Sequence, residues 1–403
     1  MAGEWRDLRW GDLATLEYGR ALRSYDTSSG RFRVFGTNGP IGWHDKALCS
    51  HPGVIIGRKG AYRGVHYSSA PFFVIDTAFY LEPKVEMDLR WAYYELLTQD
   101  INGMDSGSAI PSTSREAFYS LPVRVPPPDE QRTIACILRT LDDKIELNRR
   151  MNETLEAIAR ALFKSWFVDF DPVRAKAEGR DPGLPKPIAD LFPDRFENSD
   201  LGRIPMGWRV GSVDDEFELT MGQSPPGETY NEAGQGFPFY QGRADFSFRF
   251  PTRRVYCTAP TRFAKAGDTL VSVRAPVGDI NMASDACAIG RGVAAVRHKT
   301  GSRSYAHQFM KSIKEVFARF EAEGTVFGSI GKKDFHAIPC VNPPRDFVLT
   351  YEAHVSPLDD RVEINERESR TLAALRDALL PKLLSGEIRI KDAKKKMATG
   401  VVA

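Results

Sequence analysis

The feature that most constrains the fold is an internal repeat, because the 403-residue chain carries one pattern twice. A shift of 217 residues places Gly107–Lys164 on Gly324–Pro381 without a gap. A repeat of this length indicates two copies of one structural unit. Within it, Leu141-Asp142-Asp143 falls on Leu358-Asp359-Asp360, and Asn148 falls on Asn365.

Upstream of this stretch the repeat continues, but the offset between the copies shrinks. The second copy therefore carries about eleven additional residues between Gly222 and Gly267, and about three more after Gly278. Insertions on a duplicated scaffold are typical of surface loops, so we expect these residues to lie in such loops. The landmark pairs are Trp5 and Trp208, Gly19 and Gly222, Gly53 and Gly267, and Gly64 and Gly278.

Composition excludes several classes of protein. With 42% hydrophobic residues the chain is not disordered, and no run of 18 apolar residues predicts a membrane span. The N-terminus lacks the apolar core of a secretion signal. Five scattered cysteines without a C-x-x-C pair favour a reducing cytoplasm and argue against disulfides and a structural zinc; Cys49 and His51 alone do not make a zinc site. A net charge of +2 requires any nucleic-acid contact to be local.

The chain reads as an α+β protein with two similar mixed α/β domains and two long helices. Short β-branched and aromatic runs bounded by glycine and proline predict strands, and DLRWAYYELLTQDI and SYAHQFMKSIKEVFARFEA have helical spacing. We place the domains at 1–125 and 208–342, the helices at 126–170 and 343–388, a stiff and largely irregular proline-rich linker at 171–207, and a basic, solvated tail at 389–403.

The two helices carry matching apolar seams with one asparagine each, a residue that can set register. We expect them to pair as an antiparallel coiled coil with pseudo-two-fold symmetry. Ser356-Pro357 looks like an N-cap and a first-turn proline, so the second helix is expected to begin or kink there. The seam residues are Leu141, Ile145, Asn148, Leu155 and Leu162, and Leu358, Val362, Asn365, Leu372 and Leu379.

Two similar domains held apart by helices suit duplex DNA, whose groove faces recur about every 34 Å. Because the loops differ, the two half-sites should differ in sequence. The alternative for each candidate is an ordinary solvated turn residue, but as a group they suit base and phosphate contacts. The candidates are Arg20, Arg23, Tyr25, Asn38, Arg58, Lys59, Tyr62, Arg63, Ser114 and Arg115 in the first copy, and Gln223, Ser224, Tyr230, Asn231, Gln241, Arg243, Arg274, Ser329, Lys332 and Lys333 in the second.

The chain resembles the specificity subunit of a Type I restriction–modification system over nearly its whole length. The segments that carry the likeness are MGQSPPGETYN, FYQGRADF, PPPDEQ, ALFKSWFVDFDP, IPMGWRVG and ALLPKLLSGEI, together with the order of domain and helix. The Pro-x-x-Glu-Gln motif spans Pro127–Gln131, but the second copy reads Pro344-Arg345-Asp346-Phe347-Val348. Contacts that depend on this motif should therefore be missing from the second half.

The resemblance implies a cytoplasmic, non-catalytic subunit whose two target-recognition domains read a bipartite, asymmetric DNA sequence, with the helices setting the spacer. It also implies two methyltransferase subunits, which methylate adenine with S-adenosylmethionine, and two ATP-driven translocase–nuclease subunits that require Mg²⁺. No cofactor is expected on this chain. We expect the methyltransferase subunits to cover apolar surface on helical segments 130–167 and 345–384 and on Trp166–Phe170.

Catalytic motifs are scarce, which leaves a protein-binding coiled-coil scaffold without DNA readout as the alternative. Asn342-Pro343-Pro344-Arg345 lacks the aromatic residue of an adenine methyltransferase loop, and no ATP-binding Gly-x-x-x-x-Gly-Lys motif is present. The pairs Asp142-Asp143 and Asp359-Asp360 could bind a metal, but we expect them near helix starts, favouring the helix dipole or facing water. The sequence thus predicts no catalytic residue and no metal ligand.

Overall fold

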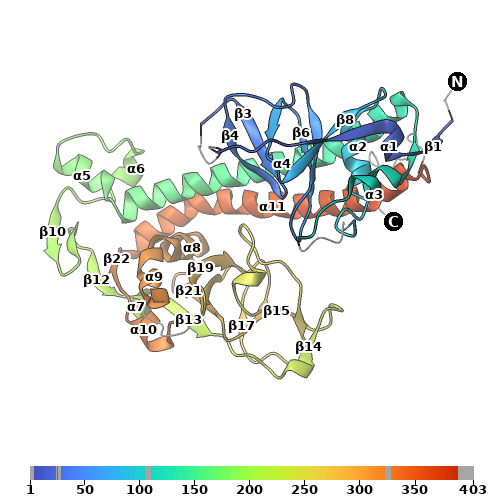
Figure 1. Cartoon of the computed structure of the whole chain (residues 1–403). Coiled ribbons are helices and arrows are strands. Elements are labelled where there is room, and N and C mark those ends of the chain that lie inside the picture. The colour runs from blue at the N-terminus through green and yellow to red at the C-terminus, as the bar shows by residue number, and fades with distance from the viewer. Residues whose placement is uncertain (1–3, 24, 26–28, 105–109, 323–327, 389–403) are drawn as a thin grey trace. The chain divides into compact units, whose positions relative to one another are not determined.

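The repeat folds into two units in the computed structural model, which describes residues 4–23, 25, 29–104, 110–322 and 328–388 (Figure 1). Unit 1 combines Met1–Leu147 with Glu368–Ala403, and unit 2 is Asn148–Arg367. The expected tail at 389–403 lies outside the described residues. Within the described part, no helix is both long and apolar enough for a membrane span.

Unit 1 contains mostly short strands, with helices that cover one face of a sheet. Buried β-branched and aromatic residues, such as those in the run GVIIG, form the central strand. Its elements are β1 (Arg6–Arg9), α1 (Trp10–Leu13), β2 (Ala14–Tyr18), β3 (Phe32–Gly36), β4 (Gly39–His44), β5 (Gly53–Gly57), β6 (Val65–Ser68), β7 (Phe72–Val74), β8 (Ala78–Pro83), α2 (Leu89–Leu96), α3 (Arg115–Ser120) and β9 (Pro122–Val125).

Unit 2 repeats this pattern after a segment of its own. The additional segment holds α5 (Asp171–Ala177), α6 (Lys186–Ala189), β10 (Phe196–Ser199) and β11 (Gly202–Pro205). The remaining elements are β12 (Arg209–Ser212), α7 (Val213–Glu216), β13 (Phe217–Met221), η1 (Gly227–Thr229), β14 (Tyr230–Asn231), β15 (Phe237–Tyr240), η2 (Arg243–Asp245), β16 (Tyr256–Cys257), β17 (Phe263–Ala264), β18 (Thr269–Val273), β19 (Val277–Met282), β20 (Cys287–Ile289), β21 (Val293–His298), α8 (Arg303–Ser312), α9 (Lys314–Ala322), α10 (Lys332–His336) and β22 (Pro339–Asn342).

Sheet topology confirms that the two copies share one fold. The four-stranded sheet of unit 1 has the order β2-β8-β5-β6, and that of unit 2 has the order β13-β21-β18-β19. Each unit also has an antiparallel pair, β1-β9 or β12-β22, and a parallel pair, β3-β7 or β15-β20. In unit 2, β16 pairs with β15 as β4 pairs with β3, and the two additional strands β14 and β17 extend this sheet, in the part of the copy that carries the inserted residues.

Two long helices confirm the expected helical repeat. Helix α4 spans Pro128–Phe167 and α11 spans Arg345–Leu384. The second helix begins at Arg345, so the expectation of a start at Ser356-Pro357 is wrong and Pro357 lies inside the helix. In unit 1, Asp142 of α4 contacts Arg376 of α11, and in unit 2 the Tyr351 hydroxyl donates to the Ala159 carbonyl. Unit 1 also pairs Lys144 with Glu368, and in unit 2 Asn148 contacts Asn365, so within each unit the residue number rises on α4 as it falls on α11 and the helices are antiparallel.

The proline-rich segment is more ordered than the sequence suggested. Helices α5 and α6 and the β10-β11 hairpin occupy much of it, and Phe192 and Ile204 are buried in the hydrophobic core of unit 2. The same core buries Trp166 and Phe167 at the end of α4. Our expectation that these two aromatic residues form exposed surface for a partner is therefore wrong, because the chain's own segment covers them. Val168, by contrast, is half exposed.

Candidate functional site

Three loops that the sequence singled out in unit 1 are joined by hydrogen bonds at one end of the four-stranded sheet. The Thr37 hydroxyl donates to the Lys59 carbonyl at 2.8 Å and so connects the β3–β4 turn to the β5–β6 loop. The Thr113 amide donates to the Arg58 carbonyl at 2.9 Å, which connects that loop to the start of α3. The backbone thus brings residues 37–38, 58–59 and 112–115 together.

A cavity of about 800 Å³ lies at this junction and has cationic and aromatic walls. The half-exposed Tyr18 ring lies close to two guanidinium groups, 4.9 Å from that of Arg58 and 5.2 Å from that of Arg115. Arg115 also donates to the Tyr119 hydroxyl at 2.9 Å. Two cations beside one aromatic ring can hold phosphates and contact bases. The lining residues are Tyr18, Arg58, Lys59, Phe79, Ile110, Ser112, Thr113, Ser114, Arg115, Glu116 and Tyr119.

Sequence reasoning proposed four of these lining residues, namely Arg58, Lys59, Ser114 and Arg115, but missed the tyrosines. Tyr18 ends strand β2 and Tyr119 lies in α3, so neither belongs to a glycine- or serine-rich turn. The signal that could have found Tyr18 is an aromatic residue directly before Gly19, the landmark where the strand ends.

The other candidates of unit 1 lie outside this cavity. Arg63 is only 2% exposed, and its guanidinium donates to the carbonyls of Gly60 and Asn102, so it holds a loop in place. Tyr25 packs with a small apolar cluster around Val34. The remaining four, Arg20, Arg23, Asn38 and Tyr62, are exposed.

Unit 2 repeats the same loop junction with different side chains. In unit 1, Lys59 pairs with Ser112 through an isolated β-bridge, and in unit 2 Arg274 pairs with Ser329 in the same way. The Ile330 amide donates to the Val273 carbonyl at 3.1 Å, as the amide of its counterpart Thr113 does in unit 1. Lys332 occupies the repeat position of Arg115 at the start of α10. The exposed candidates Arg274, Ser329, Lys332 and Lys333 therefore lie close together on one surface.

The other candidates of unit 2 divide into exposed residues and residues that hold turns. Asn231 caps its own turn, accepting from the Ala233 and Gln235 amides, and the Tyr230 hydroxyl donates to the Pro225 carbonyl. The Ser224 hydroxyl accepts from the Arg291 amide at 3.3 Å. The last three, Gln223, Gln241 and Arg243, are exposed, and Arg243 pairs with Asp279 at 2.9 Å.

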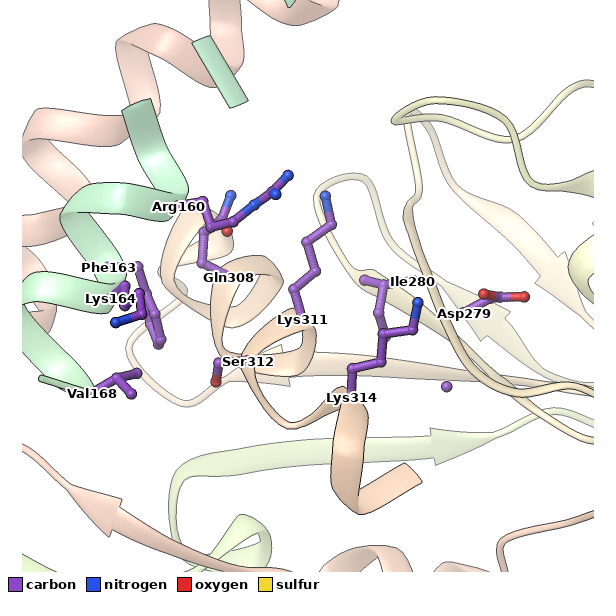
Figure 2. Close-up of a pocket in the computed structure, with 11 residues that line it drawn as sticks. Arg160, Phe163, Lys164, Val168, Asp279, Ile280, Gln308, Lys311, Ser312 and Lys314 are labelled. Carbon is purple, nitrogen blue, oxygen red and sulfur yellow. The ribbon is translucent and has the colours of Figure 1, made fainter. Parts of the chain in front are cut away.

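A second basic hollow of about 510 Å³ lies within unit 2, between the end of α4 and helix α8 (Figure 2). Arg160 and Lys164 come from α4, Lys311 comes from α8, and Lys314 lies at the start of α9. The apolar part of the wall includes Phe163. Four cationic side chains around one hollow suit an anionic group, and no sequence motif predicted them because they lie on separate helices.

Buried or partly buried polar contacts join each β-rich domain to its helices. In unit 1, the Tyr94 hydroxyl of α2 donates to the Asp142 carboxylate at 2.5 Å, and Arg376 contacts the same group at 2.9 Å. Burial and this carboxylate raise the pKa of the Tyr94 phenol above its ordinary range. In unit 2, Asp359, the repeat counterpart of Asp142, accepts from Arg249 at 2.8 Å.

These contacts correct our interpretation of the aspartate pairs. Asp142 and Asp359 lie inside α4 and α11, not near their starts, and Asp359 is 5% exposed. The expectation that the aspartate pairs lie near helix starts is wrong, and so is a water-facing position for Asp359, whereas it is confirmed for Asp143 and Asp360. The neighbouring Asp143 and Asp360 are exposed and pair with Arg139 and Arg303.

The seam candidates differ in burial. Asn148 and Asn365 are completely buried, and Asn148 donates to the Asn365 carbonyl at 3.4 Å, so each asparagine contacts its own repeat counterpart. Asn365 also donates to Asn152 at 2.8 Å. Leu141, Val362 and Leu379 are buried, and Ile145, Leu155, Leu162, Leu358 and Leu372 are partly exposed.

A third potential metal ligand, Glu82, joins Cys49 and His51 in unit 1. The Cys49 sulfur lies 3.5 Å from Nε2 and 3.6 Å from Nδ1 of His51, and is therefore not in line with either nitrogen lone pair. His51 Nδ1 lies 2.8 Å from the Pro52 carbonyl, and Nε2 lies 3.4 Å from Glu82. In this orientation one ring nitrogen is within hydrogen-bond distance of a backbone carbonyl and the other faces a carboxylate.

Comparison with known proteins adds an independent line of evidence. Residues 2–157 match the family model described as "Type I restriction modification DNA specificity domain". The chain is 30% identical over 285 residues to the putative type I restriction enzyme MjaX specificity subunit of Methanocaldococcus jannaschii, covering 70% of this chain and 62% of that protein. It is 26% identical to the type I restriction enzyme HindI specificity subunit of Haemophilus influenzae, covering 73% of this chain and 74% of that protein.

The fold is similar to that of a solved structure. The crystal structure of a Type-I restriction-modification system S subunit from M. genitalium superposes with a TM-score of 0.64 at 18% identity. The match covers 94% of this chain and 96% of that one. At this identity the similarity concerns the fold, and it extends over both units and both long helices.

Proposed function

We propose that this chain, which belongs to the family of Type I restriction–modification specificity subunits, supplies the DNA sequence specificity of such a complex. The observation that carries the proposal is the repeated loop junction, which has one backbone design and two sets of side chains. Unit 1 presents Arg58 and Arg115 around Tyr18, whereas unit 2 presents Arg274 and Lys332. Arginine and lysine both contact the guanine edge in the major groove, and their phosphate contacts position the protein without specifying sequence.

In this function each recognition domain reads one half of a bipartite target, and the unequal side chains make the two halves different in sequence. The helices set the unread gap, because α4 runs without a break from residues of unit 1 into residues of unit 2. A 40-residue helix at 1.5 Å per residue is about 60 Å long, which is sufficient to separate two half-sites.

The chemistry of the complex belongs to partner subunits in this proposal. Two methyltransferase subunits with S-adenosylmethionine modify adenine, and two translocase–nuclease subunits use ATP and Mg²⁺, in the cytoplasm. This chain contributes binding and orientation alone. The basic hollow around Arg160 and Lys164 suits an additional phosphate or an acidic group of a partner.

The test is to map adenine methylation in cells that express the partner methyltransferase with and without this chain. We expect methylation at a two-part motif with a fixed unread gap, present only when the chain is present. Methylation that does not depend on the chain, or a single uninterrupted motif, would contradict the proposal. Filter binding of the reconstituted complex to random duplexes separates DNA reading from a scaffold role, since a scaffold selects no sequence.

A further inference from the structure

One arginine of the second β-rich domain is buried against both long helices. Arg249 is 1% exposed, and its backbone is fixed to strand β19 because the Met282 amide donates to the Arg249 carbonyl at 2.9 Å. The Asn281 side chain donates to the carbonyl of Ser247, two residues earlier, at 2.8 Å. The loop that carries Arg249 therefore moves with the sheet of unit 2.

The guanidinium group of Arg249 connects the two helices. One nitrogen contacts Asp359 of α11 at 2.8 Å, and the other contacts Glu156 of α4. Glu156 also accepts from Lys311 at 2.6 Å and from Gln308 at 3.1 Å, both on α8. Figure 2 shows Gln308 and Lys311 close to Arg160 and Phe163 of α4. Arg160 lies 3.9 Å from Glu156 as well, so three cations meet two carboxylates, of which Arg249, Glu156 and Asp359 are buried while Lys311 and Arg160 remain partly exposed.

Unit 1 has no counterpart of Arg249, because only residues 37–38 connect β3 to β4, whereas residues 241–255, which include Arg249, connect the corresponding strands β15 and β16. We expected those additional residues to lie in surface loops, and for Arg249 that expectation is wrong. In unit 1 the helix carboxylate Asp142 is met by a tyrosine hydroxyl instead. The insertion has therefore given the second domain its own attachment to the helices.

We infer that Arg249 is a positioning residue for sequence reading: it fixes the recognition domain of unit 2 on the helix pair, so that the second half-site is read in register. The inference rests on the proposed function above and extends it to a residue that does not touch DNA.

The path from Arg249 to the reading surface is short and made of paired strands. Met282 of β19 pairs with Thr269 of β18, and β18 ends at Val273, directly before Arg274. The planar guanidinium of arginine presents its N–H donors in a fixed fork, so it holds two carboxylates in one relative orientation. The flexible ammonium of lysine cannot reproduce that arrangement. A displacement of about 1 Å at a positioned group can reduce a rate about a hundredfold. Loss of the bridge should therefore relax the second half of the motif and leave the first half unchanged.

The experiment uses the complete complex and maps methylation for four forms of this chain. The double variant Arg249→Met/Asp359→Leu removes both charges of the Arg249–Asp359 pair. Glu156 keeps its contacts with Lys311 and Gln308, so no buried charge is left without a partner of opposite charge. Arg249→Lys keeps the charge but cannot bond both helices. Arg253→Met is the matched control, because Arg253 lies in the same loop, is about half exposed and pairs with Asp285 rather than with a residue of either long helix.

We expect the double variant to unfold at the wild-type urea concentration but to lose about tenfold to a hundredfold of its preference for the second half-site. Arg249→Lys should show a smaller loss, and Arg253→Met none. A double variant that folds and reads the second half as the wild type does would overturn the inference. If it does not fold, an unchanged motif in Arg249→Lys overturns it instead. A wild-type chain without any two-part motif would contradict the proposed function itself, so the two failures are distinguishable.

Discussion

The two copies of the repeat make the same backbone contacts with different chemistry, and the start of each long helix shows this clearly. In unit 1 the Trp5 indole donates to the Glu130 carboxylate at 2.9 Å. In unit 2 the repeat counterparts are Trp208 and Phe347, whose rings meet at 5.1 Å. A polar contact in one copy is therefore an aromatic contact in the other.

The next position along the helix shows the same change from a polar contact in unit 1 to an apolar contact in unit 2. Gln131 is buried in unit 1, donates to the Pro126 carbonyl and accepts from the Asp88 amide. Its counterpart Val348 is completely buried in the apolar core of unit 2. The contacts of the Pro-x-x-Glu-Gln motif are thus absent from the second copy, as expected, and apolar packing takes their place. The two copies therefore keep the same backbone register and the same packed positions, while the side chain at an equivalent position is polar in one copy and apolar in the other.

The largest expected effect on stability comes from replacing the repeat counterparts Asp142 and Asp359, because the carboxylate in the second copy is the more deeply buried of the two. Asp359→Asn should lower the free energy of unfolding of unit 2 by about 3–5 kcal/mol, because Arg249 keeps only one of its two carboxylates. Asp142→Asn should lower that of unit 1 by about 1–2 kcal/mol, since its partners remain partly solvated. Urea denaturation followed by unit-specific fluorescence measures both. Equal losses of unfolding free energy in the two variants would contradict the difference between the two copies.

The stability of unit 1 should depend on pH because of Glu95. The corresponding residue of unit 2 is the apolar Phe309, which does not titrate. Burial raises the pKa of the Glu95 carboxyl from 4.5 to about 7, although Gln99 and Trp10 donate to it. Between these two values the folded state holds a proton that the unfolded state has released. The free energy of unfolding should therefore fall by about 3 kcal/mol as pH rises from 4.5 to 7 and beyond.

Glu95→Gln removes this titration, so its stability should vary less between pH 5 and pH 8 than that of the wild type. Thermal unfolding of both forms across that range measures the difference. Phe309→Leu in unit 2 is a control at the repeat position. Parallel curves for Glu95→Gln and the wild type would show that Glu95 does not titrate in this window.

Each of the two loop junctions should determine the recognition of a different half-site. Arg58→Ala/Arg115→Ala should weaken discrimination in one half of the motif by about 1–3 kcal/mol per lost base contact, and Arg274→Ala/Lys332→Ala should act on the other half. Methylation mapping with Arg180→Ala, an exposed residue remote from both junctions in sequence, as control measures the effect. If either double variant relaxed both halves equally, the assignment of one half to each unit would be wrong.

The smallest effect is expected where each asparagine contacts its counterpart. Asn148→Ala removes a hydrogen bond to Asn365 and should cost about 1 kcal/mol in urea denaturation. Asn148→Leu/Asn152→Leu/Asn365→Leu, which also removes the buried Asn152 that Asn365 contacts, should instead stabilise the helix pair while permitting other registers, because a buried asparagine specifies register at a cost in stability. Loss of stability in the triple leucine variant would show that the asparagines are stabilising in themselves.

Local patterns predicted much of this protein and failed in particular places. The apolar spacing in 126–170 and 343–388 predicted α4 and α11 closely, whereas Pro357 misled because a first-turn signal also fits inside a helix when neighbouring packing supports it. Arg63 and Arg249 show the limit for single residues. Both are arginines near glycine or serine, yet one holds a loop and the other joins two helices.

The sequence by itself determined the duplication, the two long helices and the family, because these follow from patterns that repeat along the chain. Only the tertiary structure decided which side chains meet. Tyr18, Arg58 and Arg115 lie on segments far apart in the sequence and come together through strand pairing and loop hydrogen bonds. Residue type and spacing do not encode such distant contacts, because burial and pairing depend on how the whole sheet closes around its core.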